Sequence, residues 1–137
     1  MLIESKINEI KDMFELFDDP MDKYIQIIEL GKKNIPLKDK DKNDINRIYG
    51  CTSLAWVKVI KKKNVYNIVV DSDTFIVKGL LSIIKYIIDG AKARDIEQLD
   101  ITSVLDNIGL GESITSQRTN GFLNALETIK KQIKTYE

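Results

Sequence analysis

The chain has 137 residues, and its 21 Lys and Arg residues balance 21 Asp and Glu residues, so its formal net charge is zero. This balance argues against the strongly basic face that nucleic-acid binders usually carry. The sequence contains one cysteine and no histidine. It therefore excludes an internal disulfide, a histidine-based zinc site and Cys-His or Ser-His-Asp nucleophilic chemistry within this chain. The length predicts a single domain over residues 1–137.

Targeting and membrane signals are not found. The first residues, 1–6, lack the basic and then apolar pattern of a signal peptide. The most apolar stretch, 75–88, contains Lys78 and Lys85 and is too short to span a bilayer. We therefore expect a cytoplasmic protein with a free thiol and no membrane contact.

The N-terminal third predicts two helices and a loop. Apolar residues recur at helical spacing over 3–17. Asp18-Asp19-Pro20 then offers a cap followed by a proline in the first helical turn. The second helix is expected to end at Gly31, as a C-terminal stop. Residues 34–47 are polar, with alternating charges that are typical of a solvated loop.

The middle of the chain predicts a small sheet. Residues 54–60 and 65–70 are rich in β-branched and aromatic side chains, and the polar run 61–64 between them indicates a hairpin turn. A further short strand is predicted at Ile48-Tyr49. Together these segments predict a three-stranded antiparallel sheet.

Helices follow the sheet. The first, 74–89, is expected to be capped by Asp71-Ser72-Asp73 and ended by Gly90. It is apolar on nearly all sides, which is typical of a helix at the centre of a domain. Helices, a hairpin sheet and then helices is an α+β order. The other expected helices span 92–98, 101–107 and 116–134, the last with Phe122, Leu126, Ile129 and Ile133 facing inward.

Cys51 is the candidate functional residue. It follows Gly50, which permits a tight backbone path, and it lies at a turn between two predicted strands. Thr52 and Ser53 add hydroxyls that can stabilise an anionic sulfur. A free cysteine is more often a small buried hydrophobe, and the residues alone leave that alternative open. A thiol with a pKa of about 8.5 is weakly activated at neutral pH, which suits reactivity that begins only when a partner docks.

Four segments carry motifs in a characteristic order. They are Asp22-Lys23-Tyr24 with 28–32; 46–53 with Trp56; Asp71-Ser72-Asp73 with 76–81; and Leu110 with 116–122. Together they resemble the SufE-like family of sulfur-acceptor proteins, over about residues 14–133. The chain differs from the family's usual pattern at Thr52, at Met21 and at Ser116-Gln117, where the family has glutamine, tryptophan and proline.

The resemblance implies a fold and a function. The fold is the SufE/IscU-like α+β type, with a small three-stranded antiparallel sheet packed against helices. Cys51 would accept sulfur from the persulfide of a SufS-like cysteine desulfurase, stimulate that enzyme, and pass the sulfur to a SufBCD-type iron–sulfur scaffold. The pyridoxal phosphate belongs to the desulfurase, so no cofactor or metal of its own is expected. The protein is expected to be a monomer or a homodimer.

The resemblance also implies that further residues support the Cys51 loop or contact the partner. They are Gly50, Thr52, Ser53, Asp73 and Arg118. The alternatives are a helix N-cap for Asp73, a plain turn residue for Ser53 and a surface arginine for Arg118. Trp56 is expected to pack in the core or on the sheet. Three other functions stay open: a CsdE-like acceptor for another desulfurase, a non-catalytic adaptor, and a one-cysteine thiol peroxidase.

Overall fold

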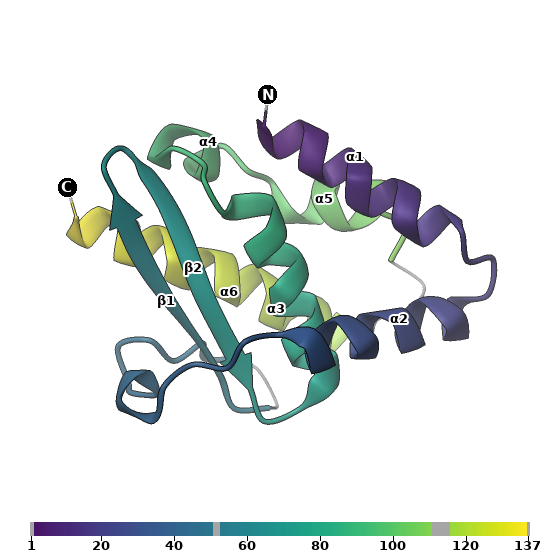
Figure 1. Ribbon diagram of the computed structural model, residues 1–137, viewed down its shortest axis with the longest axis horizontal. Helices are drawn as coiled ribbons and strands as arrows, with labels where there is room; N and C mark the ends of the chain where they lie inside the picture. The colour runs from purple at the N-terminus through teal and green to yellow at the C-terminus, as the bar shows by residue number, and fades with distance from the viewer. Residues whose placement is uncertain (1, 51–52, 111–115, 137) are drawn as a thin grey trace.

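Helix α3 (Phe75–Ile88) lies at the centre of the computed structural model, which describes residues 2–50, 53–110 and 116–136 (Figure 1). The helix packs against the strand that precedes it and against three other helices. Its central position confirms the prediction from its apolar surface, and its burial removes a large apolar area from water. The buried residues of α3 are Ile76, Val77, Gly79, Leu80, Leu81, Ile83, Ile84, Ile87 and Ile88.

A hairpin covers one side of α3. Strands β1 (Ala55–Lys62) and β2 (Val65–Ser72) pair antiparallel, from Ala55 opposite Ser72 to Lys62 opposite Val65. The turn between them contains Lys63, with a φ of 57°. Alternate residues of β1 are buried, as expected for a strand with one face on the core.

In the described part of the chain the sheet has two strands, so the prediction of three strands was wrong. The segment expected as the third strand, Ile48-Tyr49, is not a strand. Next to it, Arg47 forms a single antiparallel bridge with Trp56 of β1. The α+β class is retained, but the sheet is smaller than expected.

The C-terminal helix α6 (Ser116–Thr135) takes the place of a third strand along part of β1. The side-chain amide of Gln132 donates to the Val57 carbonyl at 2.8 Å and accepts from the Val59 N–H at 2.8 Å. The Tyr136 hydroxyl donates to the Val59 carbonyl at 2.9 Å. These side chains satisfy edge groups of β1 that another strand would otherwise pair with.

The other face of α6 confirms the predicted inward stripe. Phe122, Leu126, Ile129 and Ile133 are all buried. Figure 1 shows α6 running behind the hairpin and α3, so this stripe closes the core from that side.

Helices α1 (Leu2–Glu15) and α2 (Pro20–Lys33) lie on the side of α3 away from the hairpin (Figure 1). The N-cap of α2 is Asp19, whose carboxylate accepts from the Met21 N–H at 2.9 Å, in agreement with the predicted cap. The prediction that Gly31 ends this helix was wrong, because α2 continues to Lys33.

Gly31 is instead a contact point between helices. A Cβ atom added there would lie 2.2 Å from the Phe75 carbonyl oxygen, and one added at Gly79 would lie 1.9 Å from the Ile27 carbonyl oxygen. Both glycines therefore allow the backbones of α2 and α3 to approach closely. Glycine is used both to end helices and to allow close packing, which is why the sequence pattern wrongly predicted a helix end at Gly31.

Shorter elements complete the chain. They are the 3₁₀ turn η1 (Asp39–Asp41), α4 (Ala93–Glu97) and α5 (Ile101–Asn107). Gly90 follows α3 with a φ of 85°, as the predicted stop requires. Among the described residues, none of the helices has the length and apolar character needed to cross a membrane.

Candidate functional site

The segment before Cys51 is held to the start of β1. The Ile48 N–H donates to the Ala55 carbonyl at 2.8 Å, and the Val57 N–H donates to the Asn46 carbonyl at 2.8 Å. Ile48 and Ala55 are both buried, so these two residues close the base of a loop. We call residues 49–54 the Cys51 loop. Cys51 and Thr52 themselves lie outside the described residues.

Gly50 holds the first half of this loop against α6. Its φ of 83° lies in the region that favours glycine. A Cβ atom added there would lie 2.2 Å from Nδ2 of Asn124. The Asn124 amide therefore lies directly against the backbone that leads into the cysteine. Sequence reasoning identified Gly50 but missed Asn124, which no local pattern marks.

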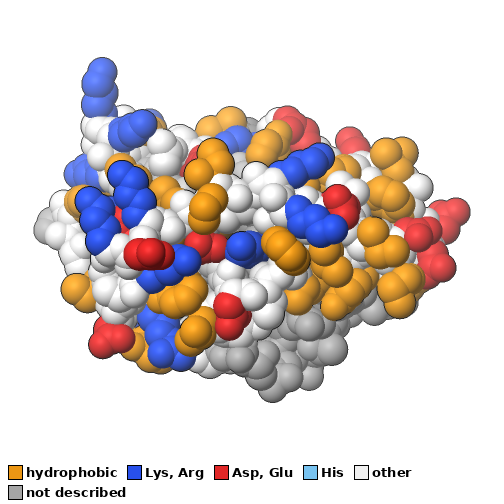
Figure 2. All heavy atoms as spheres, turned by 60° about the horizontal axis from the view of Figure 1, so that its bottom comes forward, with side chains coloured by type: hydrophobic (Ala, Val, Ile, Leu, Met, Phe, Trp, Pro, Cys, Tyr) orange, Lys and Arg blue, Asp and Glu red, His pale blue; other side chains and the backbone are white. Residues whose placement is uncertain are grey.

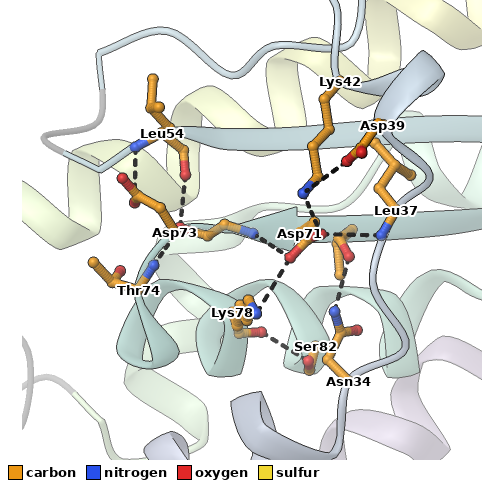
Figure 3. A network of polar contacts seen from close by, with 12 residues as sticks. Asn34, Leu37, Asp39, Lys42, Leu54, Asp71, Asp73, Thr74, Lys78 and Ser82 are labelled. Atoms are coloured by element: carbon orange, nitrogen blue, oxygen red, sulfur yellow. Dashed lines mark hydrogen bonds and ion pairs between the residues drawn. The ribbon is translucent and has the colours of Figure 1, made fainter.

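The second half of the loop is held by the junction between β2 and α3 (Figure 3). The Leu54 N–H donates to Oδ1 of Asp73 at 3.1 Å, and the Asp73 N–H donates to the Leu54 carbonyl at 3.1 Å. The Ser72 hydroxyl donates to the same carbonyl at 2.7 Å. The Ser53 and Thr74 hydroxyls lie 3.0 Å apart and form a further hydrogen bond. We call this set of contacts the loop clamp.

The clamp corrects one sequence interpretation. Asp73 is not the N-cap of α3, because that position belongs to Thr74, whose side chain makes no capping hydrogen bond. Asp73 is one residue too early to cap the helix, and its carboxylate turns to the Leu54 backbone instead. The interpretation of Asp73 as loop support or partner contact stays a prediction.

A buried carboxylate lies beneath the clamp. The side chain of Asp71 is 2 % exposed and contacts the ammonium groups of Lys42 at 3.3 Å and Lys78 at 3.5 Å. It also accepts from the backbone N–H groups of Leu37 at 3.0 Å and Ser72 at 2.8 Å. Figure 3 shows that these partners come from three separate parts of the chain. A buried charge is tolerated only with such partners, so Asp71 fixes the 34–42 segment against the junction.

A small apolar hollow of about 10 Å³ lies at the base of the Cys51 loop. It is bounded by the two residues that close the loop, Ile48 and Ala55, by α3 and by the start of α6. Its other lining residues are Val77, Leu80, Leu81, Gly121 and Phe122. The hollow has room for no more than about one water-sized group, so its lining packs the base of the loop against α3 and α6.

Exposed apolar side chains surround the loop. Tyr49 is 57 % exposed, Leu54 is 41 % exposed and Phe75 is 50 % exposed. Large exposed apolar residues gathered around a polar loop are typical of a protein-binding surface. On the face seen in Figure 2, other hydrophobic side chains gather on one side and most Lys and Arg side chains on the other.

The remaining predicted positions are only partly described. Arg118 lies in the first turn of α6, and its side chain is outside the described residues. Trp56 is partly buried on β1, and the Lys42 ammonium lies 5.4 Å from the centre of its ring. This position agrees with the predicted sheet-face packing of Trp56. The structure thus brings Gly50, Ser53 and Asp73 together around one loop.

The fold and the site define an α+β protein in which held segments precede and follow the one cysteine along the sequence. A protein-family model described as SufE, an Fe-S metabolism associated domain, matches residues 8–133. The chain therefore belongs to the SufE family.

Relatives agree with this assignment. An uncharacterized SufE-like protein of Rhizobium etli is 32 % identical over 97 % of this chain and 93 % of its own length. Another, of Rhizobium meliloti, is 30 % identical over 93 % of this chain and 94 % of its own length. The solution structure of a hypothetical protein from Thermus thermophilus has the same fold, with a TM-score of 0.77 and 15 % identity over 95 % of this chain and 94 % of that chain.

Proposed function

We propose that this protein is a sulfur acceptor in which Cys51 takes a sulfur atom from the persulfide of a SufS-like cysteine desulfurase. The observation that carries the proposal is the family membership of the whole chain, which contains one cysteine. Membership in a family associated with Fe-S metabolism supports a role in sulfur transfer. The identity of the partner enzyme and the mechanism of transfer are what we propose.

The transfer is a thiol–disulfide exchange. The Cys51 thiolate attacks the outer sulfur of the desulfurase persulfide. The sulfur–sulfur bond of the donor breaks as a new one forms on Cys51, and the desulfurase thiolate leaves. The bond exchange needs no external oxidant or reductant, and the proton released by Cys51 is available to the leaving thiolate. With one cysteine, the chain has no second thiol that could convert the product into an internal disulfide.

The described residues have supporting roles in this proposal. The loop clamp and the Gly50–Asn124 contact hold the described residues on both sides of Cys51 and Thr52. The exposed Tyr49, Leu54 and Phe75 offer the partner apolar area around the loop. Thr52 and Arg118 stay proposed partner or loop contacts.

The wider setting is also proposed. Cys51 persulfide would donate its sulfur to a SufBCD-type scaffold in the cytoplasm, with pyridoxal phosphate supplied only by the desulfurase. The chain would act as a monomer or a homodimer. A CsdE-like acceptor would use the same chemistry with a different desulfurase.

Intact-mass measurement tests the proposal. The protein is incubated with a purified SufS-like desulfurase and free cysteine and is then analysed without reductant. We expect the wild type to gain one or more sulfur atoms and Cys51→Ser to gain none. Lack of any gain with an active desulfurase would overturn the proposal.

The same samples separate the alternatives. Stimulation of the desulfurase that persists in Cys51→Ser would favour an adaptor. Peroxide turnover by the isolated wild type would favour a thiol peroxidase.

A further inference from the structure

A second surface feature lies beside the Cys51 loop. A groove of about 260 Å³ runs between residues 44–49 and the outer face of α6. We call it the Arg47 groove. Its lining includes Arg47, Tyr49, Thr128 and Lys131. Neither the loop clamp nor the apolar hollow uses these side chains.

The guanidinium of Arg47 has unused hydrogen-bond donors. Within the described residues its side chain makes no hydrogen bond or ion pair, and its Nε atom is buried without a partner. Its guanidinium carbon lies 5.2 Å from the centre of the Tyr49 ring, a cation–π contact that restricts its position. The buried Nε is not accessible to a ligand, but the terminal N–H groups of the guanidinium also have no acceptor among the described residues, so a ligand in the groove can supply one.

The charges of the groove favour an anion. Arg47 and Lys131 both line it, and Asp44 is the one acidic residue in the lining. Among the described residues, Asp44 forms no ion pair with either cation, although these side chains share the groove. The planar guanidinium presents paired N–H groups that match the two oxygens of a carboxylate.

The shape of the groove favours a protein side chain over a small molecule. A small ligand is usually enclosed on most sides. Here the lining includes Ile45, which is 79 % exposed, and Tyr49, which is 57 % exposed. Tyr and Arg are enriched at the centres of protein interfaces, where a partner covers them.

The groove is also next to the reacting loop. Tyr49 precedes Gly50, and Gly50 lies against Asn124 of α6. Asn124 is one helical turn before Thr128, whose hydroxyl donates to the Asn124 carbonyl at 2.9 Å. A protein that reaches Cys51 with its own cysteine therefore covers this groove with adjacent surface.

We propose that the Arg47 groove binds an acidic side chain of the cysteine desulfurase and so orients that enzyme on the Cys51 loop. This inference rests on the proposed function, because it names the contact through which the same partner docks. The carboxylate would lie between Arg47 and Lys131, with the Tyr49 ring fixing the guanidinium.

Binding measurements with a purified SufS-like desulfurase test the groove. We expect Arg47→Gln and Lys131→Gln each to weaken Kd about threefold to tenfold, and the double variant to weaken it further. The double variant should also lose most of the salt dependence of Kd. Arg47→Lys should recover part of the affinity, because it keeps the charge but not the paired donors.

A matched control removes a positive charge elsewhere. Lys62 is exposed at the far end of the hairpin, so Lys62→Gln should leave Kd unchanged. Thermal unfolding of each variant shows whether it is folded. If Arg47→Gln does not fold, Lys131→Gln alone tests the groove, because Lys131 is exposed.

The outcomes distinguish the two proposals. At saturating desulfurase, the variants should still gain sulfur on Cys51, because the groove acts on docking and not on the sulfur exchange. A double variant that binds as tightly as wild type at low salt would overturn the groove while leaving sulfur transfer intact. Wild type that neither binds nor gains sulfur would overturn the proposed function, and the groove inference with it.

Discussion

The two ends of α3 are both tied to the hairpin by polar groups, but they hold different partners. At the C-terminal end, the Lys85 ammonium donates to the Ile68 carbonyl at 2.7 Å and pairs with Asp89 at 2.6 Å. Asp89 in turn accepts from the Ile68 N–H at 2.9 Å. Ile68, Lys85 and Asp89 belong to β2 or to α3 and its end, which are neighbours along the chain, and the Lys6 ammonium of α1 also donates to the Asp89 carbonyl at 2.5 Å. This end fastens the hairpin to the helix.

The N-terminal end of α3 connects segments that are far apart in sequence. Asp73 and Ser72 hold Leu54, and Asp71 holds Lys42 and the Leu37 backbone. Leu54 is part of the Cys51 loop. One end of the helix therefore supports the fold alone, whereas the other also positions the proposed reactive loop.

The largest loss of stability is expected from a substitution between the two ends of α3, where α2 crosses it. In Gly79→Ala the new Cβ would overlap the Ile27 carbonyl, so we expect the free energy of unfolding to fall by about 3 kcal/mol. Urea denaturation measures this change. Sulfur acceptance by the folded fraction should stay at the wild-type level, because neither polar end is altered.

Gly90→Ala is the matched control for this substitution. Its Cβ would lie 3.7 Å from Leu2, so only the strain of a positive φ remains, and we expect a loss of about 1 kcal/mol. If both variants lost the same free energy of unfolding, the result would contradict a close contact between α2 and α3 at Gly79.

Asp71→Ala should produce the next largest loss of stability. It leaves two ammonium groups and two backbone N–H groups without their acceptor, although both lysines are partly exposed and can be rehydrated. We expect the free energy of unfolding to fall by about 2 kcal/mol. Asp71→Asn, which keeps one carbonyl oxygen, should retain part of this stability. A loss as small as that of an exposed surface substitution would show that water replaces the network freely.

The smallest effect on stability, and the sharpest test of the comparison, comes from Asp73→Ala. It removes the acceptor of the Leu54 N–H, so hydrogen exchange of that amide should become about fivefold faster. The rate of sulfur acceptance should change with it. Asp89→Ala is the control at the other end, where the Ile68 amide should lose protection and sulfur acceptance should not change. Identical effects of both variants on sulfur acceptance would contradict the division between the two ends.

Much of the fold could be predicted from the sequence, and the errors have physical causes. The inward stripe of α6 was correct because apolar residues at helical spacing share one face wherever the helix packs. Gly31 was misread because its close contact with the Phe75 carbonyl exists only in three dimensions. The third strand was wrong because the segment pairs with β1 only through the Arg47–Trp56 bridge, and farther along β1 its edge groups at Val57 and Val59 bond instead to Gln132 and Tyr136.

The candidate site likewise has features that the sequence marks and features that only the folded structure reveals. Gly50, Asp71 and Asp73 belong to motifs that the sequence marks, but Asn124, the ion pairs of Asp71 and the Arg47 groove could not be predicted, because no local pattern marks them. Their significance depends on which side chains from distant segments meet, and on which donors are left without acceptors.

The order of helices and strands, the faces that turn inward, the family and the single cysteine all follow from the sequence alone. They depend on residue spacing and residue type, which are local. Two other properties became known only from the folded chain: Asp73 accepts the Leu54 N–H instead of capping α3, and the Arg47 side chain lines a groove and makes no hydrogen bond or ion pair among the described residues. Hydrogen bonds and ion pairs act over a few ångströms, so they are known only when the tertiary structure shows which groups come that close.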